Sequence, residues 1–357
     1  MYPFKKGYYA VHNGWYVAAF RRDVSDQLVS RWILNQPVVL FRKQDGDVTC
    51  LSGLCPHRFF PLADSHLKDD TITCAYHGIA FDAEGQCTNI PGQDNIPSSC
   101  QLKKYPVVEH GMWVWVWPGD PTKADTSLLP DLAHIGHDGE GITASPLYFY
   151  EVQARYQLLT DNLTDLSHLA YLHGSSIGSS GNAEVPEDLS EAAGVLYSSR
   201  TIRDCEAPPV VKEFHHYEGN INQVSAMNFY YPGLHAGSVE MTFPDDHERA
   251  GEAMRAMYIF HAITPATRHS CYYHFGLASK DVQQIENMRG YLQHVVQEDI
   301  DASQAIEHIL QSGSAPSREV MKFSDQNSVR ARMTLMKLMD KERGVTDTPV
   351  TVQSAEG

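Results

Sequence analysis

The chain has 357 residues, of which 42% are hydrophobic and 20% are charged. These proportions exclude a disordered or collagen-like chain, and the length indicates about two domains. There are 44 acidic and 28 basic residues, which gives a formal net charge of −16. Nucleic acids and anionic membrane surfaces attract clustered positive charge, so this balance argues against either as the main partner.

The sequence shows neither a membrane span nor a secretory leader. No run approaches the roughly 18 consecutive apolar residues of a spanning helix, and the N-terminus lacks an apolar segment with a small-residue cleavage site. The seven cysteines are odd in number and scattered, which favours a reducing compartment over a disulfide framework. We therefore expect a soluble, cytoplasmic protein in which some cysteines bind metal.

Residues 1–120 are predicted to be rich in β-strands. The apolar run 38–41 leads into a turn at Asp45-Gly46-Asp47, which is typical of a hairpin. Residues 112–117 alternate tryptophan with valine and predict a strand that is apolar on both faces. From 121 to 145, Pro, Asp, Gly and His are frequent, so this segment is predicted to be a linker.

The remainder is predicted to be a second domain, residues 146–345, that mixes helices with a sheet. We expect a helix from 158 to 172, several strands between 195 and 275, and a long helix from 283 to 311. The polar residues 346–357 are predicted to form a loose tail.

Two short segments each combine a cysteine with a histidine: Cys55-Pro56-His57 and, further along, Cys74-Ala75-Tyr76-His77. Zinc sites usually pair cysteine with cysteine and histidine with histidine within a segment. A Rieske-type [2Fe–2S] cluster needs two cysteines on one iron and two histidines on the other. The mixed segments favour this cluster, with zinc as the alternative. The other cysteines are expected to be small hydrophobic residues in the core: Cys50, Cys87, Cys100, Cys205 and Cys271.

His168 and His173 lie on an apolar segment that also contains Asp165. Taken alone, histidines on such a segment are more often core residues than ligands. Their i, i+5 spacing does not place them on one helix face, so the helix must bulge or break between them if both bind one metal. Asp165 lies three residues before His168 and could accept the second ring N–H of a metal-bound imidazole.

The long helix offers a third ligand, Asp299, which falls inside its apolar stripe. A carboxylate on a buried face is costly unless a cation meets it. With His168 and His173 it would complete a 2-His-1-carboxylate triad for Fe(II). The alternative is that Asp299 caps a helix or pairs with a basic residue. The predicted stripe comprises Leu292, Val295, Val296, Ala302, Ile306, Ile309 and Leu310.

Together these motifs resemble those of the Rieske non-heme iron oxygenases. Cys55-Pro56-His57-Arg58 with Cys74-Ala75-Tyr76-His77-Gly78 is similar to the Rieske motif, and Asp161 to His173 with Gln297-Glu298-Asp299 is similar to the iron-binding elements. Nearly the whole chain resembles the group of vanillate O-demethylase, dicamba O-demethylase and toluenesulfonate methyl-monooxygenase. The resemblance implies an α+β chain, with an N-terminal all-β Rieske [2Fe–2S] domain and a C-terminal helix-grip-like catalytic domain with an antiparallel sheet.

The resemblance further implies a terminal oxygenase component containing a [2Fe–2S] cluster and a mononuclear Fe(II). Such a protein hydroxylates a methyl or methoxy group of an aromatic substrate with O₂, for example in O-demethylation of a vanillate-like methoxybenzoate. Electrons would come from a separate NAD(P)H-dependent flavin and iron–sulfur reductase, because no convincing G-x-G-x-x-G follows a strand here. A homotrimer is implied, in which Asp165 bridges His77 of a neighbour to His168, and Asn162 lies near the iron without firmly ligating it.

By resemblance to dicamba O-demethylase, Asn228 and His261 lie where the carboxylate and ether of the substrate are held. The alternative for Asn228 is a strand residue that bonds to its neighbours. Gly290 stands where that enzyme has a tryptophan, which opens space. Other outcomes remain open: benzylic methyl hydroxylation, N-demethylation or ring hydroxylation, and, outside enzymes, a [2Fe–2S] electron carrier.

Overall fold

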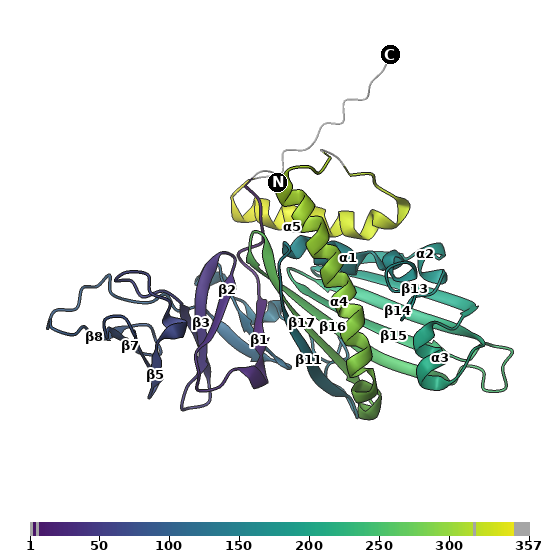
Figure 1. Cartoon of the computed structure of the whole chain (residues 1–357), viewed down its shortest axis with the longest axis horizontal. Coiled ribbons are helices and arrows are strands. Elements are labelled where there is room, and N and C mark those ends of the chain that lie inside the picture. Colours follow the sequence, from purple (N-terminus) through teal and green to yellow (C-terminus); the bar gives the residue numbers. More distant parts are fainter. Residues whose placement is uncertain (1–2, 5–6, 317–318, 346–357) are drawn as a thin grey trace, which may run out of the picture.

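The structure is a computed structural model that describes residues 3–4, 7–316 and 319–345. The predicted tail, residues 346–357, lies outside the described residues. Figure 1 shows a smaller part made mostly of strands beside a larger part in which helices lie over a broad sheet. Within the described ranges, no helix combines the length and apolar character needed to cross a membrane.

The described part of the N-terminal domain forms three small antiparallel sheets. Their strands are β1 (Tyr16–Phe20), β2 (Val29–Ile33), β3 (Gln36–Arg42), β4 (Val48–Ser52), β5 (His66–Lys68), β6 (Thr71–Thr73), β7 (Ala80–Phe81), β8 (Cys87–Asn89), β9 (Val107–His110) and β10 (Trp113–Val116). The sheet orders are β1-β10-β9, β2-β3-β4 and β5-β6-β7-β8. The predicted hairpin is confirmed as β3 and β4, and the tryptophan–valine strand as β10.

The second domain is built on a sheet of seven described strands. They are β11 (Thr143–Val152), β12 (Asp188–Ala192), β13 (Val195–Glu206), β14 (Asn220–Tyr230), β15 (Leu234–Thr242), β16 (Ala253–Thr267) and β17 (Ser270–Ser279). Neighbours run antiparallel in the order β11-β17-β16-β15-β14-β13-β12. The strands predicted between 195 and 275 are confirmed, and β11 begins at Thr143, inside the segment predicted as a linker.

Helices cover the sheet and connect its strands. The α-helices are α1 (Tyr156–Thr164), α2 (Gly181–Glu184), α3 (Pro209–His215), α4 (Val282–Ser312) and α5 (Gln326–Glu342). The short 3₁₀ helices are η1 (Arg21–Asp23), η2 (Leu62–Asp64), η3 (Pro121–Lys123), η4 (Thr126–Leu128), η5 (Leu166–Ala170) and η6 (Phe323–Asp325). The predicted long helix is confirmed as α4, which runs across the sheet in Figure 1. It begins where the Asp281 carboxylate accepts from the amides of Gln283 and Gln284.

The two faces of the sheet have different neighbours. On β16, Phe260 and Ala262 face the N-terminal domain, and the Phe260 ring lies 5.5 Å from that of Trp113 between centroids. Met257 and Ile259 of the same strand belong to the core beneath α1 and α4. Since successive side chains of a strand alternate between faces, one strand both joins the domains and lines the space under the helices.

The buried face of α4 differs from the predicted stripe in its C-terminal half. The stripe up to Asp299 is buried as predicted, but Ile306 and Ile309 are each 49% exposed. Glu307 is buried instead and forms an ion pair with Arg155, Nε to Oε2 2.5 Å. Glu307 lies eight residues after Asp299, hence on the same helix face, and this ion pair occupies the position that apolar residues were expected to fill.

Removing the Arg155–Glu307 pair should destabilise the protein strongly at neutral pH. The Glu307 side chain is 1% exposed, and loss of one partner leaves a buried charge uncompensated, which costs about 3–5 kcal/mol. Burial alone would raise the pKa of Glu307, but hydrogen bonds from Arg155, Gln311 and His269 outweigh it and lower that pKa to about 2. We therefore expect Glu307→Gln to lower the melting temperature at pH 7.

Calorimetry of wild type and Glu307→Gln across pH tests this expectation. Because the pKa of Glu307 is depressed in the folded state, its stabilising effect is present above its ordinary pKa and is lost as pH falls from about 4.5 to about 2. The difference in melting temperature should therefore shrink over that range. Glu252→Gln, which removes an exposed carboxylate paired with Arg249, should change little. A constant difference at all pH values would contradict the assignment.

Candidate metal centres and substrate cavity

The first two predicted motifs form loops with the same backbone pattern, here called the Rieske loops (residues 55–60 and 74–79). In each loop the cysteine amide donates to the carbonyl five residues later, and the amide four residues later donates to the cysteine carbonyl, at 2.8–2.9 Å. Phe59 and Gly78 occupy this fourth position with φ of 57° and 72°. That conformation is easy for glycine and uncommon for phenylalanine. The hydrogen bonds that close the first loop therefore hold Phe59 in a backbone conformation that is unfavourable for this residue by itself.

The Rieske loops bring all four predicted donors together. Cys55 and Cys74 are 2% and 1% exposed, so both thiols are buried. His57 and His77 are exposed, with their Nδ1 atoms 3.1 Å apart. Two inner sulfur donors and two outer imidazoles are the donor set that a Rieske cluster requires, with thiolates on one iron and imidazoles on the other.

The helix predicted over 158–172 is not continuous. α1 ends just before Asp165, whose carboxylate accepts from the amide of Ser167 at 3.0 Å, and η5 follows. Such a side-chain bond to the local backbone competes with continuation of the helix. The expected irregularity is confirmed, because η5 ends at Ala170, between His168 and His173, and residues 171–177 form turns. The break at Asp165 is a second interruption, which precedes His168.

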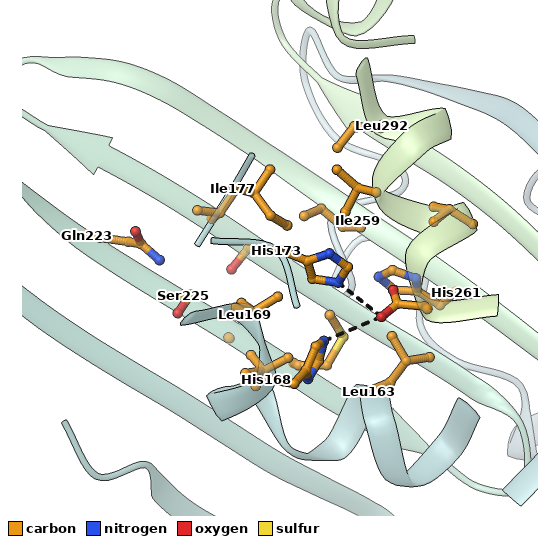
Figure 2. Close-up of a pocket in the computed structure, with 18 of the residues that line it drawn as sticks. Leu163, His168, Leu169, His173, Ile177, Gln223, Ser225, Ile259, His261 and Leu292 are labelled. Atoms are coloured by element: carbon orange, nitrogen blue, oxygen red, sulfur yellow. Dashed lines mark hydrogen bonds and ion pairs between the residues drawn. The ribbon is translucent and has the colours of Figure 1, made fainter. Parts of the chain in front are cut away.

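His168, His173 and Asp299, here called the facial triad, converge between η5 and α4. Their ligand atoms all lie within 4.8 Å of one another. Nε2 of His173 is 3.0 Å and Nε2 of His168 3.6 Å from the same Asp299 oxygen, as the dashed lines in Figure 2 show. Asn162 donates to that oxygen at 2.9 Å. The predicted set is thus brought together, and it suits one metal ion with further coordination positions open.

The other ring nitrogens of the two histidines have oxygen acceptors. Nδ1 of His168 is bonded to the backbone carbonyl of Asp165 at 2.5 Å, although the prediction gave this role to the Asp165 carboxylate. Nδ1 of His173 is bonded to Glu298 at 2.8 Å. These contacts leave Nε2 of both rings directed at Asp299, and partners of this kind fix the tautomer and orientation of metal-binding imidazoles.

The carboxylate of Asp165 is engaged away from His168 within the chain. It accepts from the Ser167 amide and forms an ion pair with Lys322 at 3.2 Å. This is the reason that the backbone of Asp165, not its side chain, bonds to His168. The side chain is 16% exposed, so part of it faces solvent beside the facial triad.

Burial and neighbouring charges set the protonation of the facial triad. Burial lowers the pKa of His168 and so favours the neutral imidazole, which is the metal-binding form. Burial also acts on His173, but the hydrogen bonds and charges of Asp299 and Glu298 outweigh it and raise its pKa. Asp299 would have its pKa raised by burial, yet the two histidines lower it overall. The centre is therefore one buried anion facing two imidazoles, which suits a cation.

A cavity of about 110 Å³ opens beside the facial triad. Figure 2 shows His261 on one side of the two ligand histidines and Gln223 and Ser225 on the other. His261 lines the cavity, as expected of a substrate residue, and its Nδ1 is bonded to the Tyr273 hydroxyl at 2.5 Å. Most of the wall is apolar, including Leu163, Leu169, Ile177, Ile259, Phe275 and Leu292. Such a cavity suits an aromatic ring next to a metal.

Asn228 is not among the residues that line this cavity. On β14, Gln223, Ser225, Ala226 and Met227 line it. Asn228 follows Met227, and the side chain of the next residue of a strand points to the opposite face. The Asn228 side chain accepts from the backbone amide of Ser198 at 3.3 Å. This contact favours the alternative interpretation, in which Asn228 bonds to the neighbouring strand.

Several polar side chains at the site were not predicted. Glu298 holds His173, and its position next to Asp299 on the same helix was the available signal. Gln223, Ser225 and Arg255 line the cavity. The available signal for Arg255 was its position two residues before Met257 on β16. Since every second residue of a strand faces the same side, Arg255 places a charge on the core side with Met257.

Comparison with known proteins agrees with both centres. Residues 14–106 match the Rieske [2Fe–2S] domain, and residues 152–341 match the vanillate O-demethylase oxygenase C-terminal domain. The first match contains both Rieske loops, so the zinc alternative is set aside. The second contains the whole facial triad.

Relatives align with nearly the full chain. The oxygenase component of dicamba O-demethylase from Stenotrophomonas maltophilia is 31% identical, covering 93% of this chain and 98% of its own. The iron–sulfur subunit of a toluene-4-sulfonate monooxygenase system from Comamonas testosteroni is 31% identical, covering 94% and 99%. A crystal structure of dicamba monooxygenase bound to 3,6-dichlorosalicylic acid has a TM-score of 0.84 at 28% identity, covering 94% and 99%. The chain therefore belongs to the family of Rieske oxygenase components that carry the vanillate O-demethylase oxygenase C-terminal domain.

Proposed function

We propose that this protein is the terminal oxygenase component of a Rieske monooxygenase that acts on a methyl or methoxy group of an aromatic substrate. With a methoxybenzoate such as vanillate, hydroxylation of the O–CH₃ carbon gives a hemiacetal that collapses to a phenol and formaldehyde. One observation carries the proposal: a single chain holds two distinct iron donor sets, and the second faces a cavity that suits an aromatic ring. An electron carrier would need only the first set.

We infer that the Rieske loops hold a [2Fe–2S] cluster and that the facial triad holds Fe(II). When bound, these groups supply one-electron transfer and the activation of O₂. The amide of Asn162 steadies the Asp299 oxygen, and Glu298 orients His173. The apolar wall binds the ring of the substrate and excludes water from its reacting methyl group.

Electron supply to the facial triad is proposed to come from another copy of the chain. Figure 1 places β5, β7 and β8, which lie beside the Rieske loops in sequence, at one end of the long axis, remote from α1 and α4. We propose a homotrimer in which the partly exposed Asp165 connects His77 of the partner subunit to His168. Because the relatives are named as components of multicomponent systems, we also propose a separate NAD(P)H-dependent flavin and iron–sulfur reductase. The odd number of scattered cysteines supports our further proposal of a cytoplasmic location.

Iron analysis and product analysis test the proposed function together. The purified protein should contain about three irons per chain, two from the cluster and one from the facial triad. With a surrogate reductase and a panel of methoxylated and methylated benzoates, O₂ uptake should match formaldehyde release. Two irons per chain without O₂ uptake would identify an electron carrier. A hydroxymethyl product without formaldehyde would identify benzylic hydroxylation.

Replacing Glu298 by glutamine should weaken iron binding at the facial triad. Glu298 accepts from Nδ1 of His173 at 2.8 Å, and loss of such an orienting carboxylate typically lowers metal affinity 10- to 100-fold. Titration of the iron-depleted protein with Fe(II) measures the change. Glu286→Gln, on the same helix but paired with Arg289 at the surface, is the matched control and should bind iron like wild type. Equal affinity of Glu298→Gln and wild type would contradict the orienting role.

A further inference from the structure

Arg255 on β16 is a buried cation with no acidic partner among the described residues. It is 4% exposed, and none of the residues that the structure describes forms a hydrogen bond with its Nε. Its Nη2 contacts the thioether sulfur of Met257 at 3.2 Å, which is a weak acceptor. Burial lowers the pKa of Arg255 to about 10, so the guanidinium is charged at neutral pH. A buried charge in this state is strongly unfavourable until an anion meets it.

The other buried arginines of the described chain do have acidic partners. Arg155 pairs with Glu307 at 2.5 Å, and Arg200 pairs with Glu187 at 3.3 Å. The fold therefore provides a carboxylate for a buried guanidinium in each of these cases. Arg255 differs in that it lines the cavity, so its counter-ion can be a bound molecule.

Two further polar groups with unmet hydrogen bonds among the described residues line the same cavity as Arg255, two strands away on the sheet. Gln223 pairs with Met241 across β14 and β15, and Met241 pairs with Arg255 across β15 and β16, so the three residues form one row on the sheet. Ser225 is two residues along β14 on the same face. Within the described chain, the Gln223 Oε1 and Ser225 Oγ atoms are buried and have no hydrogen-bond partner. Both side chains carry donors that an anion can use.

We propose that Arg255, with Gln223 and Ser225, binds the anionic group of the substrate, a carboxylate or a sulfonate. The inference rests on the proposed function, because it assigns a binding role to the part of the same cavity that Arg255, Gln223 and Ser225 line. A guanidinium presents paired donors that match two oxygens of such a group. The substrate thereby supplies a counter-ion for Arg255, which the described residues do not provide.

The position of Arg255 also specifies where the anionic group lies on the ring. Arg255 and His261 are six residues apart on β16, which separates their Cα atoms by roughly 20 Å at 3.3 Å per residue. Figure 2 likewise shows Gln223 and Ser225 on the side of the ligand histidines opposite to His261. The facial triad lies between His261 and the side of Gln223 and Ser225. A substrate whose methyl group reacts at the triad therefore directs its anionic group away from that methyl group, toward Gln223, Ser225 and Arg255. Toluene-4-sulfonate has this para arrangement, whereas a salicylic acid carries its two groups on neighbouring carbons.

Calorimetric binding to the iron-loaded protein under anaerobic conditions tests this subsite without turnover. The probes are 4-methoxybenzoate, toluene-4-sulfonate, 2-methoxybenzoate and the neutral 4-methoxybenzamide. Wild type should bind the two para anions more tightly than the other two probes. Arg255→Met should weaken binding of the para anions by about 10- to 100-fold and leave the amide unchanged. Arg255→Lys should restore part of the affinity, and Arg203→Met, which removes an exposed guanidinium of β13, should bind like wild type.

Steady-state kinetics should show the same pattern, with Arg255→Met raising KM for 4-methoxybenzoate and leaving kcat nearly unchanged. Equal binding of the para anions by Arg255→Met and wild type would overturn the inference. Selective weakening without formaldehyde from any probe would support the anion subsite and reject the proposed reaction. If Arg255→Met does not fold, Gln223→Leu and Ser225→Ala replace it. Both variants should selectively weaken the binding of the para anions, and unchanged binding of these anions in both variants would overturn the inference.

Discussion

Replacing Asp299 by alanine should remove the mononuclear iron and abolish product formation while the Rieske cluster remains. The Asp299 oxygen lies 3.0 and 3.6 Å from the two ligand imidazoles, and it is the single anion of the facial triad. Two neutral imidazoles alone bind Fe(II) weakly. The loss of activity should therefore exceed the roughly 100-fold that removal of an orienting partner produces.

Iron content and the spectrum of the reduced cluster measure the two centres separately. In Asp299→Ala the iron content should fall from about three to about two per chain, and the rhombic signal of the reduced Rieske cluster should persist. The matched control is Asp301→Ala on the same helix, where the carboxylate is exposed and accepts from Gln297 at 2.8 Å. The control should keep three irons. Three irons in Asp299→Ala would contradict the assignment of this ligand.

Replacing Asp165 by asparagine should leave both iron centres loaded and reduce turnover by on the order of 100-fold or more, since small errors of placement at such a junction have effects of this size. Asparagine caps a helix about as well as aspartate, so the bond to the Ser167 amide can persist and η5 should keep its place. The negative charge that pairs with Lys322 is lost. The proposed connection between His77 of the partner subunit and His168 would lose its carboxylate.

Single-turnover measurements distinguish this effect from a folding defect. With the cluster chemically reduced and substrate and O₂ added, its reoxidation should be slow in Asp165→Asn and fast in wild type. Asp188→Asn, which changes an exposed carboxylate on β12, is the control and should behave like wild type. Full turnover by Asp165→Asn, or loss of iron from it, would contradict the proposed role.

The Rieske loops could be predicted almost completely from the sequence because their structure is local. In each loop, ligands three or fewer residues apart are held by hydrogen bonds that close within six residues. The position of Asp299 inside an apolar helical stripe indicated that a partner meets its charge, but left open whether that partner is a metal or a basic residue. The resemblance to the oxygenases favoured the metal. The same helix shows the limit, since the burial of Glu307 in place of Ile306 depends on Arg155, which is distant in sequence.

The arrangement around the facial triad could be predicted only in part. The i, i+5 spacing indicated an interruption between His168 and His173, and η5 does end at Ala170. It did not indicate the second break at Asp165, where the side chain bonds to the amide of Ser167. Asn228 was placed in the site by resemblance, yet the alternation of β14 puts it on the face away from the cavity.

The sequence by itself determined the donor types and the Rieske-type grouping of the first four, because these ligands lie within two short segments. Its resemblance to the Rieske oxygenases implied the second centre and the class of fold. Only the tertiary structure decided which acceptor holds each imidazole, and that Arg255 faces the cavity without an acidic partner in the described part of the chain. The physical reason is that these features depend on strand register and on contacts between segments more than one hundred residues apart, such as His173 with Glu298. Local pattern carries no information about contacts of that kind.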